Sequence, residues 1–279
     1  MFTLSDITIC YNDKNGLKAT LDSFLNQDVL VDRDCSWLEI IVVDGGSTDG
    51  SVELIKEYQD KFETKGIEYR YVSESDSGRY QAMNKGIKLA KNDYLIFMNS
   101  GDCLVEKNTL GELENKIEEW MNFKPAGIVD IFYGDCLRQY ESESIVQRAF
   151  PIDSIKKGLP FSHQSAITRA ELMKKRLYVE RLNISADYEW FLWAYTEGKI
   201  FQYIPMVISS FDKEGISSTA LYKTYLEAIK IREKYGIADP YIISKLKQIC
   251  WFFLDKINPD GKRLEQFTEK LARNRGNRC

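Results

Sequence analysis

The sequence predicts an α/β fold with a largely parallel central sheet flanked by helices. Short apolar runs, each too short for a helix, alternate with segments of helical spacing, and this alternation is typical of parallel sheets with helices on both faces. The runs are Ile7 to Tyr11, Leu38 to Val43, Ile67 to Val72 and Tyr94 to Met98. With 279 residues and 44% hydrophobic composition, the chain can bury one large core and carry an appendage.

The second half of the chain continues the pattern of strands and helices. Further strands are predicted over Ile128 to Asp135, Ile145 to Phe150 and Ile200 to Ser210. Helices are predicted over Lys107 to Trp120, from Ser185 through Tyr195, and over Leu221 to Tyr235 and Tyr241 to Ile257. We therefore expect one domain over residues 1–217 and a C-terminal helical extension over 218–279.

Charge and cysteine content narrow the function classes. The net charge of −4 and the pI of about 5.4 give no basic field that would bind nucleic acid. Six scattered cysteines with no CxxC pair, and the single His163, cannot complete a zinc site, so we expect reduced thiols. Asp6 interrupts the first apolar segment, so we expect no signal peptide, and no apolar run is long enough for a membrane span.

Polar residues follow the end of each of the first four strands. They include Tyr11 and Asn12, then Asp44, then Glu74 and Asp76, and finally Asp102. Any one of them is ordinary, because turns favour such residues. Together, however, they would define the sheet edge at which α/β proteins bind ligands. The sequence has no GxGxxG and no GxxxxGK[ST], which disfavours dinucleotide-binding and P-loop proteins.

Asp102 follows the buried fourth strand in the short polar run Asn99-Ser100-Gly101-Asp102. A carboxylate with little bulk around it suits a divalent cation that holds a ligand's phosphates. The alternative is that Asp102 caps the following helix or bonds its own turn.

Three motifs make the sequence similar to a known family. VDGGSTDGS (Val43 to Ser51), SESDSGRYQAMNKGI (Ser73 to Ile87) and FMNSGD (Phe97 to Asp102) resemble the family 2 inverting glycosyltransferases of the GT-A fold, which is Rossmann-like. The resemblance covers roughly Ile7 to Ser217 and is strongest to bacterial enzymes of capsule, O-antigen and colanic-acid type. It implies a nucleotide-sugar-binding half over 1–105 and an acceptor-binding half over 106–217.

The resemblance implies roles for the strand-end residues. Tyr11 and Asp44 would hold the base and ribose of a nucleotide sugar, expected to be UDP-linked, and Asp76 would lie near the nucleotide or the donor sugar. Asn84 and Lys85 would lie close by, and Ser100 and Gly101 would contact the nucleotide or the donor sugar. Asp102 would bind Mn²⁺ or Mg²⁺ as the one acid of a DxD-like element.

The resemblance also places Asp187 at the catalytic base, with Glu189 as the fallback and as a possible acceptor or phosphate contact. An inverting transfer needs a carboxylate that accepts the proton of the attacking hydroxyl. The alternative is that Asp187 is a first-turn acid favoured by the helix dipole. His163 could contact the acceptor or phosphates, or it could be a buried core histidine. Lys213 falls in a segment that resembles a loop closing over the donor, and it could contact the diphosphate.

The absence of QxxRW, a mark of processive synthases in this family, favours transfer of a single sugar. The resemblance implies a lipid-linked acceptor, an undecaprenyl diphosphate saccharide. Residues 220–279 carry 13 Lys and Arg against 7 Asp and Glu beside an apolar helical face. This suits binding to the anionic inner membrane surface from the cytoplasm, but also packing on the catalytic domain or in a homodimer.

Two rival classes remain at this point. A nucleotidyltransferase also places acids at the end of an α/β sheet, but it normally has a glycine-rich basic loop after the first strand, which residues 10–15 lack. A non-catalytic nucleotide-sugar-binding protein would not need separate acids at the metal and base positions.

Overall fold

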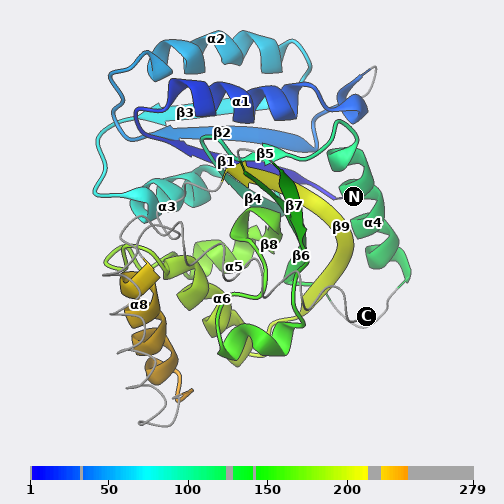
Figure 1. The fold of residues 1–279 in the computed structure, drawn as a ribbon. Helices are drawn as coiled ribbons and strands as arrows, with labels where there is room; N and C mark the ends of the chain where they lie inside the picture. Colours follow the sequence, from blue (N-terminus) through cyan, green and yellow to red (C-terminus); the bar gives the residue numbers. More distant parts are fainter. Residues whose placement is uncertain (1, 32–33, 124–127, 141–142, 213–220, 238–279) are drawn as a thin grey trace. The chain divides into compact units, whose positions relative to one another are not determined.

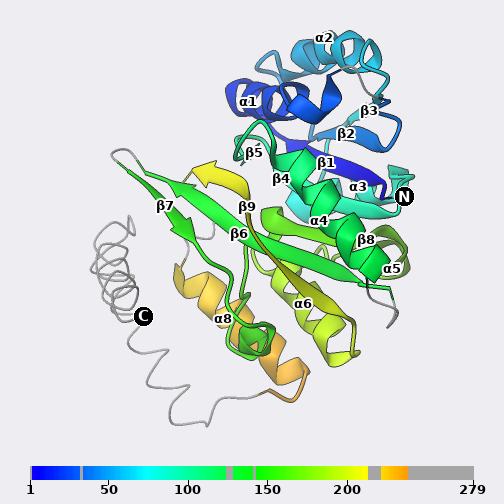
Figure 2. The same cartoon turned by 90° about the vertical axis from the view of Figure 1, so that its right-hand side faces the viewer.

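The computed structural model describes residues 2–31, 34–123, 128–140, 143–212 and 221–237 (Figures 1 and 2). The chain divides into two compact units, Met1–Asp212 and Lys213–Cys279, whereas the sequence suggested a boundary at Ser217. In the second unit, α8 (Leu221–Lys234) lies where a helix was predicted, with Arg232 and Lys234 in its last turn. The helix predicted over 241–257 lies outside the described residues.

The first half of the chain forms the parallel part of the sheet. The strands β1 (Leu4–Cys10), β2 (Leu38–Asp44), β3 (Glu68–Ser73) and β4 (Tyr94–Asn99) lie in the order β3-β2-β1-β4. All three neighbouring pairs are parallel. Their carboxyl ends therefore meet at one edge of the sheet, and the predicted α/β fold class is confirmed.

Helices cover both faces of this parallel half. The helices α1 (Lys14–Leu25) and α2 (Ser51–Glu63) lie on one face, and α3 (Arg79–Leu89) lies on the other (Figure 1). Gly86 lets α3 approach β1 closely, because a Cβ there would lie 2.3 Å from Ile7 Cγ2. Every residue of β1 and β2 is buried, which explains their continuous apolar character.

The second half extends the sheet in the order β4-β8-β6-β9-β5, with β7 paired to β6. The strands are β5 (Cys103–Leu104), β6 (Ile131–Gln139), β7 (Ser144–Gln147), β8 (Ala166–Arg169) and β9 (Phe201–Asp212). Antiparallel β8 lies between β4 and β6, and long parallel β6 and β9 lie side by side (Figure 2). The short β5 and β8 were not predicted.

The remaining helices lie around this half. They are α4 (Thr109–Phe123), α5 (Ala170–Lys175) and α6 (Ala186–Thr196), with 3-10 turns at Asp28–Leu30, Ile152–Lys156 and His163–Ser165. The core between helices and sheet is aliphatic and aromatic, and its largest fully buried side chain is Trp190. No helix in the described part of the chain is long and apolar enough to cross a membrane.

Candidate active site

Asp44 ends β2 and is fully buried at the carboxyl edge of the sheet. Its Oδ2 accepts hydrogen bonds from Gly46 N at 3.1 Å, Ser47 N at 3.0 Å and Ser73 Oγ at 2.7 Å. Its Oδ1 is buried and has no hydrogen-bond partner among the described residues. A buried acceptor without a donor is costly, so this oxygen is suited to a ligand's hydroxyl or N–H group.

The loop after β1 is tied to the loop after β2. Asn12 N donates to Ser47 Oγ at 2.7 Å, and Thr48 N donates to Asn12 Oδ1 at 2.8 Å. Asn12 adopts a positive φ of 49°, which asparagine tolerates better than most residues. The neighbouring Tyr11 is 67% exposed, so its ring is available for stacking.

Tyr11, Gly45 and Asp76 line one narrow space. A Cβ on Gly45 would lie 2.9 Å from Asp76 Oδ2 and 3.2 Å from Tyr11 Cδ2. The other oxygen of Asp76 accepts a hydrogen bond from Gly78 N at 2.9 Å, which fixes the carboxylate at the start of α3. The structure therefore brings Tyr11, Asp44 and Asp76 together, although they lie at or just after the ends of three different strands.

Asn84 does not face this edge. It is 2% exposed, and its amide bonds the backbone of Tyr178 in both directions and the Glu180 carboxylate at 2.9 Å. The expected donor contact at Asn84 is thus replaced by a structural role, which attaches α3 to the segment before α6. Lys85, the next residue, forms an ion pair with the loop after β3, where its Nζ lies 2.9 Å from Glu74 Oε1.

Asp102 is 7% exposed and is held by its neighbours. Its Oδ2 accepts hydrogen bonds from Asn99 N at 2.9 Å, Asn99 Nδ2 at 2.8 Å and Gln164 Nε2 at 3.0 Å. Burial raises the pKa of the Asp102 carboxyl, and nearby His163 and these hydrogen bonds oppose that effect. The predicted helix begins at Thr109, after β5, so Asp102 does not cap it. The hydrogen bonds from Asn99 instead match the alternative in which Asp102 bonds its own turn.

Ser100 and Gly101 form the turn that presents Asp102. Ser100 N donates to Ile9 O at 2.9 Å, and Gly101 N donates to Thr20 Oγ1 at 3.0 Å. Gly101 has a φ of +93°, which side-chain-bearing residues rarely adopt. Glycine is therefore required here by the backbone, and open space surrounds its Cα.

His163 lies between the two acids of the site. Its Nδ1 is 3.5 Å from Asp187 Oδ2, and its Nε2 is 3.5 Å from Asn99 Nδ2, which in turn binds Asp102. The side chains of His163 and Asp187 are 16% and 17% exposed. The structure thus brings Asp102, His163 and Asp187 into one cluster, and His163 is neither a free surface residue nor a fully buried one.

Asp187 lies in the first turn of α6, so the helix-dipole alternative describes its position correctly. Its Oδ1 accepts hydrogen bonds from Tyr188 N at 2.8 Å and Tyr80 Oη at 3.2 Å. Its Oδ2 faces His163. One oxygen is therefore engaged with the fold, and the other is directed to the cluster.

Glu189 is removed from the site. It is 1% exposed, and both its oxygens accept from Arg176 Nη2, at 2.7 and 2.9 Å. The suggestion of Glu189 as a fallback base or ligand contact is therefore wrong, because the carboxylate is consumed by a buried ion pair. Lys213 lies outside the described residues.

Asp102 and His163 could supply part of the ligand set of the metal ion that the resemblance implies. In the described ranges, no three His, Cys, Asp or Glu side chains gather closely enough to hold a metal by themselves. Asp102 with His163 nearby offers a carboxylate and an imidazole, which suit Mn²⁺. A metal ion that binds substrate phosphates usually takes its other ligands from those phosphates and from water. This partial set therefore fits a metal that binds together with a diphosphate.

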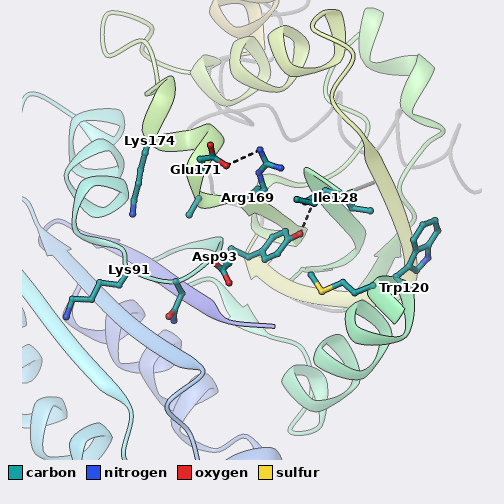
Figure 3. Close-up of a pocket in the computed structure, with 12 residues that line it drawn as sticks. Lys91, Asp93, Trp120, Ile128, Arg169, Glu171 and Lys174 are labelled. Atoms are coloured by element: carbon teal, nitrogen blue, oxygen red, sulfur yellow. Dashed lines mark hydrogen bonds and ion pairs between the residues drawn. The ribbon is translucent and has the colours of Figure 1, made fainter. Parts of the chain in front are cut away.

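A cavity of about 650 Å³ lies at the opposite edge of the sheet (Figure 3). It lies around Asp93 and Tyr94, where β4 begins, and its wall includes Trp120 and Arg169. Asp102 follows the other end of β4. This cavity is therefore separate from the cluster of acids.

Three site residues were missed from the sequence. Asn99 and Gln164 hold Asp102, and Tyr80 holds Asp187. All three lie within or beside motifs that drew attention for other residues. An amide or hydroxyl that orients a carboxylate leaves no pattern of its own in the sequence.

Comparison with known proteins identifies the family. The family model described as glycosyl transferase family 2 matches residues 5–176. A PGL/p-HBAD biosynthesis glycosyltransferase of Mycobacterium bovis is 27% identical over 224 residues, covering 79% of this chain and 81% of that protein. A poly(ribitol-phosphate) beta-glucosyltransferase of Bacillus spizizenii is 23% identical over 70% of this chain and 33% of its own length.

Solved structures share the fold. S. aureus TarS 1–349 in complex with UDP-GlcNAc superposes with a TM-score of 0.62 at 18% identity, over 82% of this chain and 66% of that one. The mannosyltransferase PcManGT from Pyrobaculum calidifontis, in complex with GDP-Man and Mn²⁺, gives 0.58 at 17% identity, over 81% and 64%. Since the chain spans 39% of the longer TarS structure, that protein has parts with no counterpart here. The family match excludes the nucleotidyltransferase and the non-catalytic binding protein: this chain belongs to glycosyl transferase family 2.

Proposed function

We propose that this glycosyltransferase moves one sugar, with inversion, from a UDP-sugar to a hydroxyl of a lipid-linked saccharide. The observation that carries the proposal is the cluster in which Asp102 and Asp187 lie on either side of His163. Two separate carboxylates can then serve the leaving diphosphate and the attacking hydroxyl. The UDP and UDP-GlcNAc complexes of TarS, a neighbour in fold, support the choice of donor.

On the side that would bind the sugar donor, the chain offers a buried oxygen that can accept a hydrogen bond and an exposed aromatic ring. The buried Asp44 Oδ1 would accept a hydrogen bond from the base or a ribose hydroxyl. Tyr11 would stack on the base, and Asp76 would bind the nucleotide or the donor sugar across the narrow space at Gly45. That space is shaped by the absence of a Cβ, which favours a flat ligand group.

On the diphosphate side, Asp102 and His163 would hold a divalent metal ion, Mn²⁺ or Mg²⁺. When bound, such an ion neutralises charge on the departing diphosphate. Asn99 and Gln164 keep Asp102 oriented through hydrogen bonds to one of its oxygens. PcManGT, whose structure contains GDP-Man and Mn²⁺, supports metal use.

On the acceptor side, Asp187 would act as the general base. The acceptor oxygen forms a bond with the anomeric carbon as the bond from that carbon to the diphosphate oxygen breaks, and Asp187 takes the hydroxyl proton. Attack from the face opposite the diphosphate inverts the anomeric centre. The oxygen of Asp187 that faces the cluster, Oδ2, is the one suited to accept the proton.

The acceptor and the place of action rest on the C-terminal extension. Its basic residues and apolar helical pattern support binding to the cytoplasmic face of an anionic membrane, where a lipid-linked acceptor of a bacterial surface glycan would be presented. O-antigen and capsule assembly are the processes in which such acceptors are extended. A homodimer through the same extension is the other arrangement that this pattern suits.

A thermal-shift panel tests the donor proposal. The full chain is melted with UDP-glucose, UDP-GlcNAc, UDP-galactose and GDP-mannose, with and without manganese. A ligand that binds the native state raises the melting temperature. We expect a UDP-sugar to give the largest shift, and manganese to enhance it. Equal shifts with GDP-mannose, or shifts unaffected by the metal, would contradict the proposed donor or the metal site, respectively.

A further inference from the structure

Tyr80 lies between the donor side of the site and the candidate base. It is the second residue of α3, is 4% exposed, and its hydroxyl contacts two acceptors across a long stretch of chain. The closer acceptor is Ile184 O, at 2.5 Å, in the residues that lead into α6. The other is Asp187 Oδ1, at 3.2 Å, so the single hydroxyl proton is shared between these two acceptors. No motif considered in the sequence analysis gave this tyrosine a role.

The ring of Tyr80 is fixed from both ends. Upstream, Gly78 N donates to Asp76 Oδ1, which holds the start of α3 to a residue of the donor side. Downstream, α3 lies on β1 at Gly86 without room for a Cβ. The ring also packs against Tyr178, with centroids 5.5 Å apart. These contacts fix the position of the Tyr80 hydroxyl relative to Asp187.

We propose that Tyr80 is a positioning residue, which holds Asp187 Oδ1 so that Oδ2 is presented to the acceptor hydroxyl. This inference rests on the proposed function, in which Asp187 is the base. Without Tyr80, Oδ1 keeps the bond from Tyr188 N, but that bond comes from its own helix turn and does not tie the carboxylate to α3. A misplacement of about 1 Å in a catalytic group can cost about 10² in rate.

The environment keeps Tyr80 a hydrogen-bond donor. Burial, and next the charge of Asp187, raise the pKa of the Tyr80 hydroxyl well above its ordinary value. The phenol therefore stays protonated over the range in which the enzyme would work. Its one proton is shared between the Ile184 carbonyl and the Asp187 carboxylate, so the hydroxyl ties α3 both to the start of α6 and to the segment just before it.

Tyr178 provides a matched control. It is as buried as Tyr80, packs in the same aromatic cluster, and its hydroxyl has no hydrogen-bond partner among the described residues. Tyr178→Phe therefore removes a phenol oxygen from the same region without removing a hydrogen bond to Asp187. We expect Tyr178→Phe to keep the wild-type turnover number.

The test is a double-mutant cycle on the full chain. The variants are Tyr80→Phe, Asp187→Asn and the combination, with Tyr178→Phe as control. Turnover is measured as UDP release from the UDP-sugar with the largest thermal shift, with octyl glycosides as acceptor probes, and donor affinity is measured by calorimetry. We expect Tyr80→Phe to lower kcat about tenfold to 10²-fold, with donor Kd within about twofold and little effect in the Asp187→Asn background.

The outcomes separate this inference from the proposed function. If Asp187→Asn turns over like the wild type, the base assignment fails and the positioning role fails with it. If Asp187→Asn is slow but Tyr80→Phe keeps the wild-type kcat, the positioning role alone is overturned. An equal loss from Tyr80→Phe in both backgrounds, or the same loss from Tyr178→Phe, would show a general structural effect and also overturn it.

Discussion

The two carboxylates of the cluster are held in different ways, and this decides how each responds to substitution. Asp102 is deeply buried, and one oxygen accepts all three of its hydrogen bonds. Asp187 is partly exposed, with one oxygen bonded to the fold. Burial of the ionised Asp102 carboxylate therefore destabilises the fold, although the same carboxylate can bind a cation. Asp187, in contrast, can exchange a proton with a substrate.

We predict that Asp102→Asn makes the fold more stable but weakens metal-dependent binding of the UDP-sugar. Burial raises the pKa of Asp102, so the fold favours the protonated form, and stability is lost as pH rises from the unfolded pKa of about 3.9 through the folded one. Asparagine keeps an acceptor oxygen but never ionises. The melting temperature of the variant without metal should exceed that of the wild type, by a margin that widens as pH rises from about 4.

The same variant should lose the manganese-enhanced thermal shift with the UDP-sugar, because an amide is a weak ligand for a hard cation. Asp93→Asn is the control, since Asp93 is an exposed acid at the opposite edge of the sheet. It should keep the metal-enhanced shift. A full metal-enhanced shift in Asp102→Asn would remove Asp102 from the metal site.

For Asp187→Asn we predict a loss of about 10² to 10⁴ in kcat, the usual contribution of a general base, with donor affinity nearly unchanged. Turnover and calorimetry on the same preparation measure the two effects. Asparagine preserves the shape and can accept the bonds from Tyr80 and Tyr188, so the melting temperature should change little. Weakened donor binding with near-normal turnover would contradict the base role.

Glu189→Gln, on the same helix, is the matched comparison. Glu189 is buried and paired with the half-buried Arg176, so its neutralisation removes the ionic attraction from this pair. We expect a lower melting temperature, with the kcat of the folded fraction close to the wild type. The two variants thus separate a loss of chemistry from a loss of stability.

For single residues, the sequence could predict a site residue only where the order of strands and helices fixed its place at the carboxyl edge of the sheet. Asp44 and Asp102 follow buried parallel strands, and the ends of such strands meet at one edge. Asn84 and Glu189 were expected to face a ligand, because the sequence of a helix does not show whether a polar residue faces a ligand or is hydrogen-bonded within the protein. Only the three-dimensional partners, Tyr178 and Arg176, decide between these cases.

Among the elements, the turn between β4 and β5 links backbone conformation to chemistry. Gly101 has a φ of +93° with open space around it, and Asp102 follows directly. Gly66, in the turn between α2 and β3, has a φ of +74° and also has open space, but it lies far from Asp102 along the chain. Both positions would therefore be strained by a side chain, but only at Gly101 would that strain act next to Asp102.

We predict that Gly101→Ala and Gly66→Ala each cost about 1–2 kcal/mol of stability, the penalty of a left-handed conformation for a side-chain-bearing residue. Denaturant unfolding measures this cost. Only Gly101→Ala should also weaken the manganese-dependent binding of the UDP-sugar, because relief of its strain moves Asp102. Equal donor binding in both variants would show that the turn tolerates alanine without displacing the carboxylate.

The elements predicted from sequence were those that carry a strong local pattern. The four strands of the parallel half and helices α1 to α4 follow from apolar runs and helical spacing. The two-residue β5 and four-residue β8 are too short to show a pattern. Insertion of β8 between β4 and β6 depends on contacts distant in sequence, and no local signal specifies it.

For the whole molecule, charge is unevenly divided. Residues 220–279 carry a surplus of +6 within a chain of net charge −4, so the preceding residues carry −10. An acidic catalytic unit is repelled by an anionic membrane, while a basic extension is attracted to it.

The last prediction is that the extension, rather than the charge of the whole chain, binds anionic vesicles. Lys245, Lys247 and Lys256 are changed together to Glu in the full chain, and co-sedimentation with phosphatidylglycerol vesicles is measured over a range of salt concentrations. Each basic residue near an anionic surface contributes about 1 kcal/mol, so binding should fall steeply. Salt should weaken the wild type more than the variant, because exposed charges are screened beyond about 10 Å at 0.1 M.

The matched control changes Lys88, Lys107 and Lys174, three exposed lysines of the first unit, to Glu. This set alters the net charge by the same amount without touching the extension. If binding depends on the extension, the control should sediment with vesicles nearly as well as the wild type. If both triple variants lose binding equally, the overall charge governs attraction, and the extension is then better explained by packing on the catalytic unit or on a second copy of the chain.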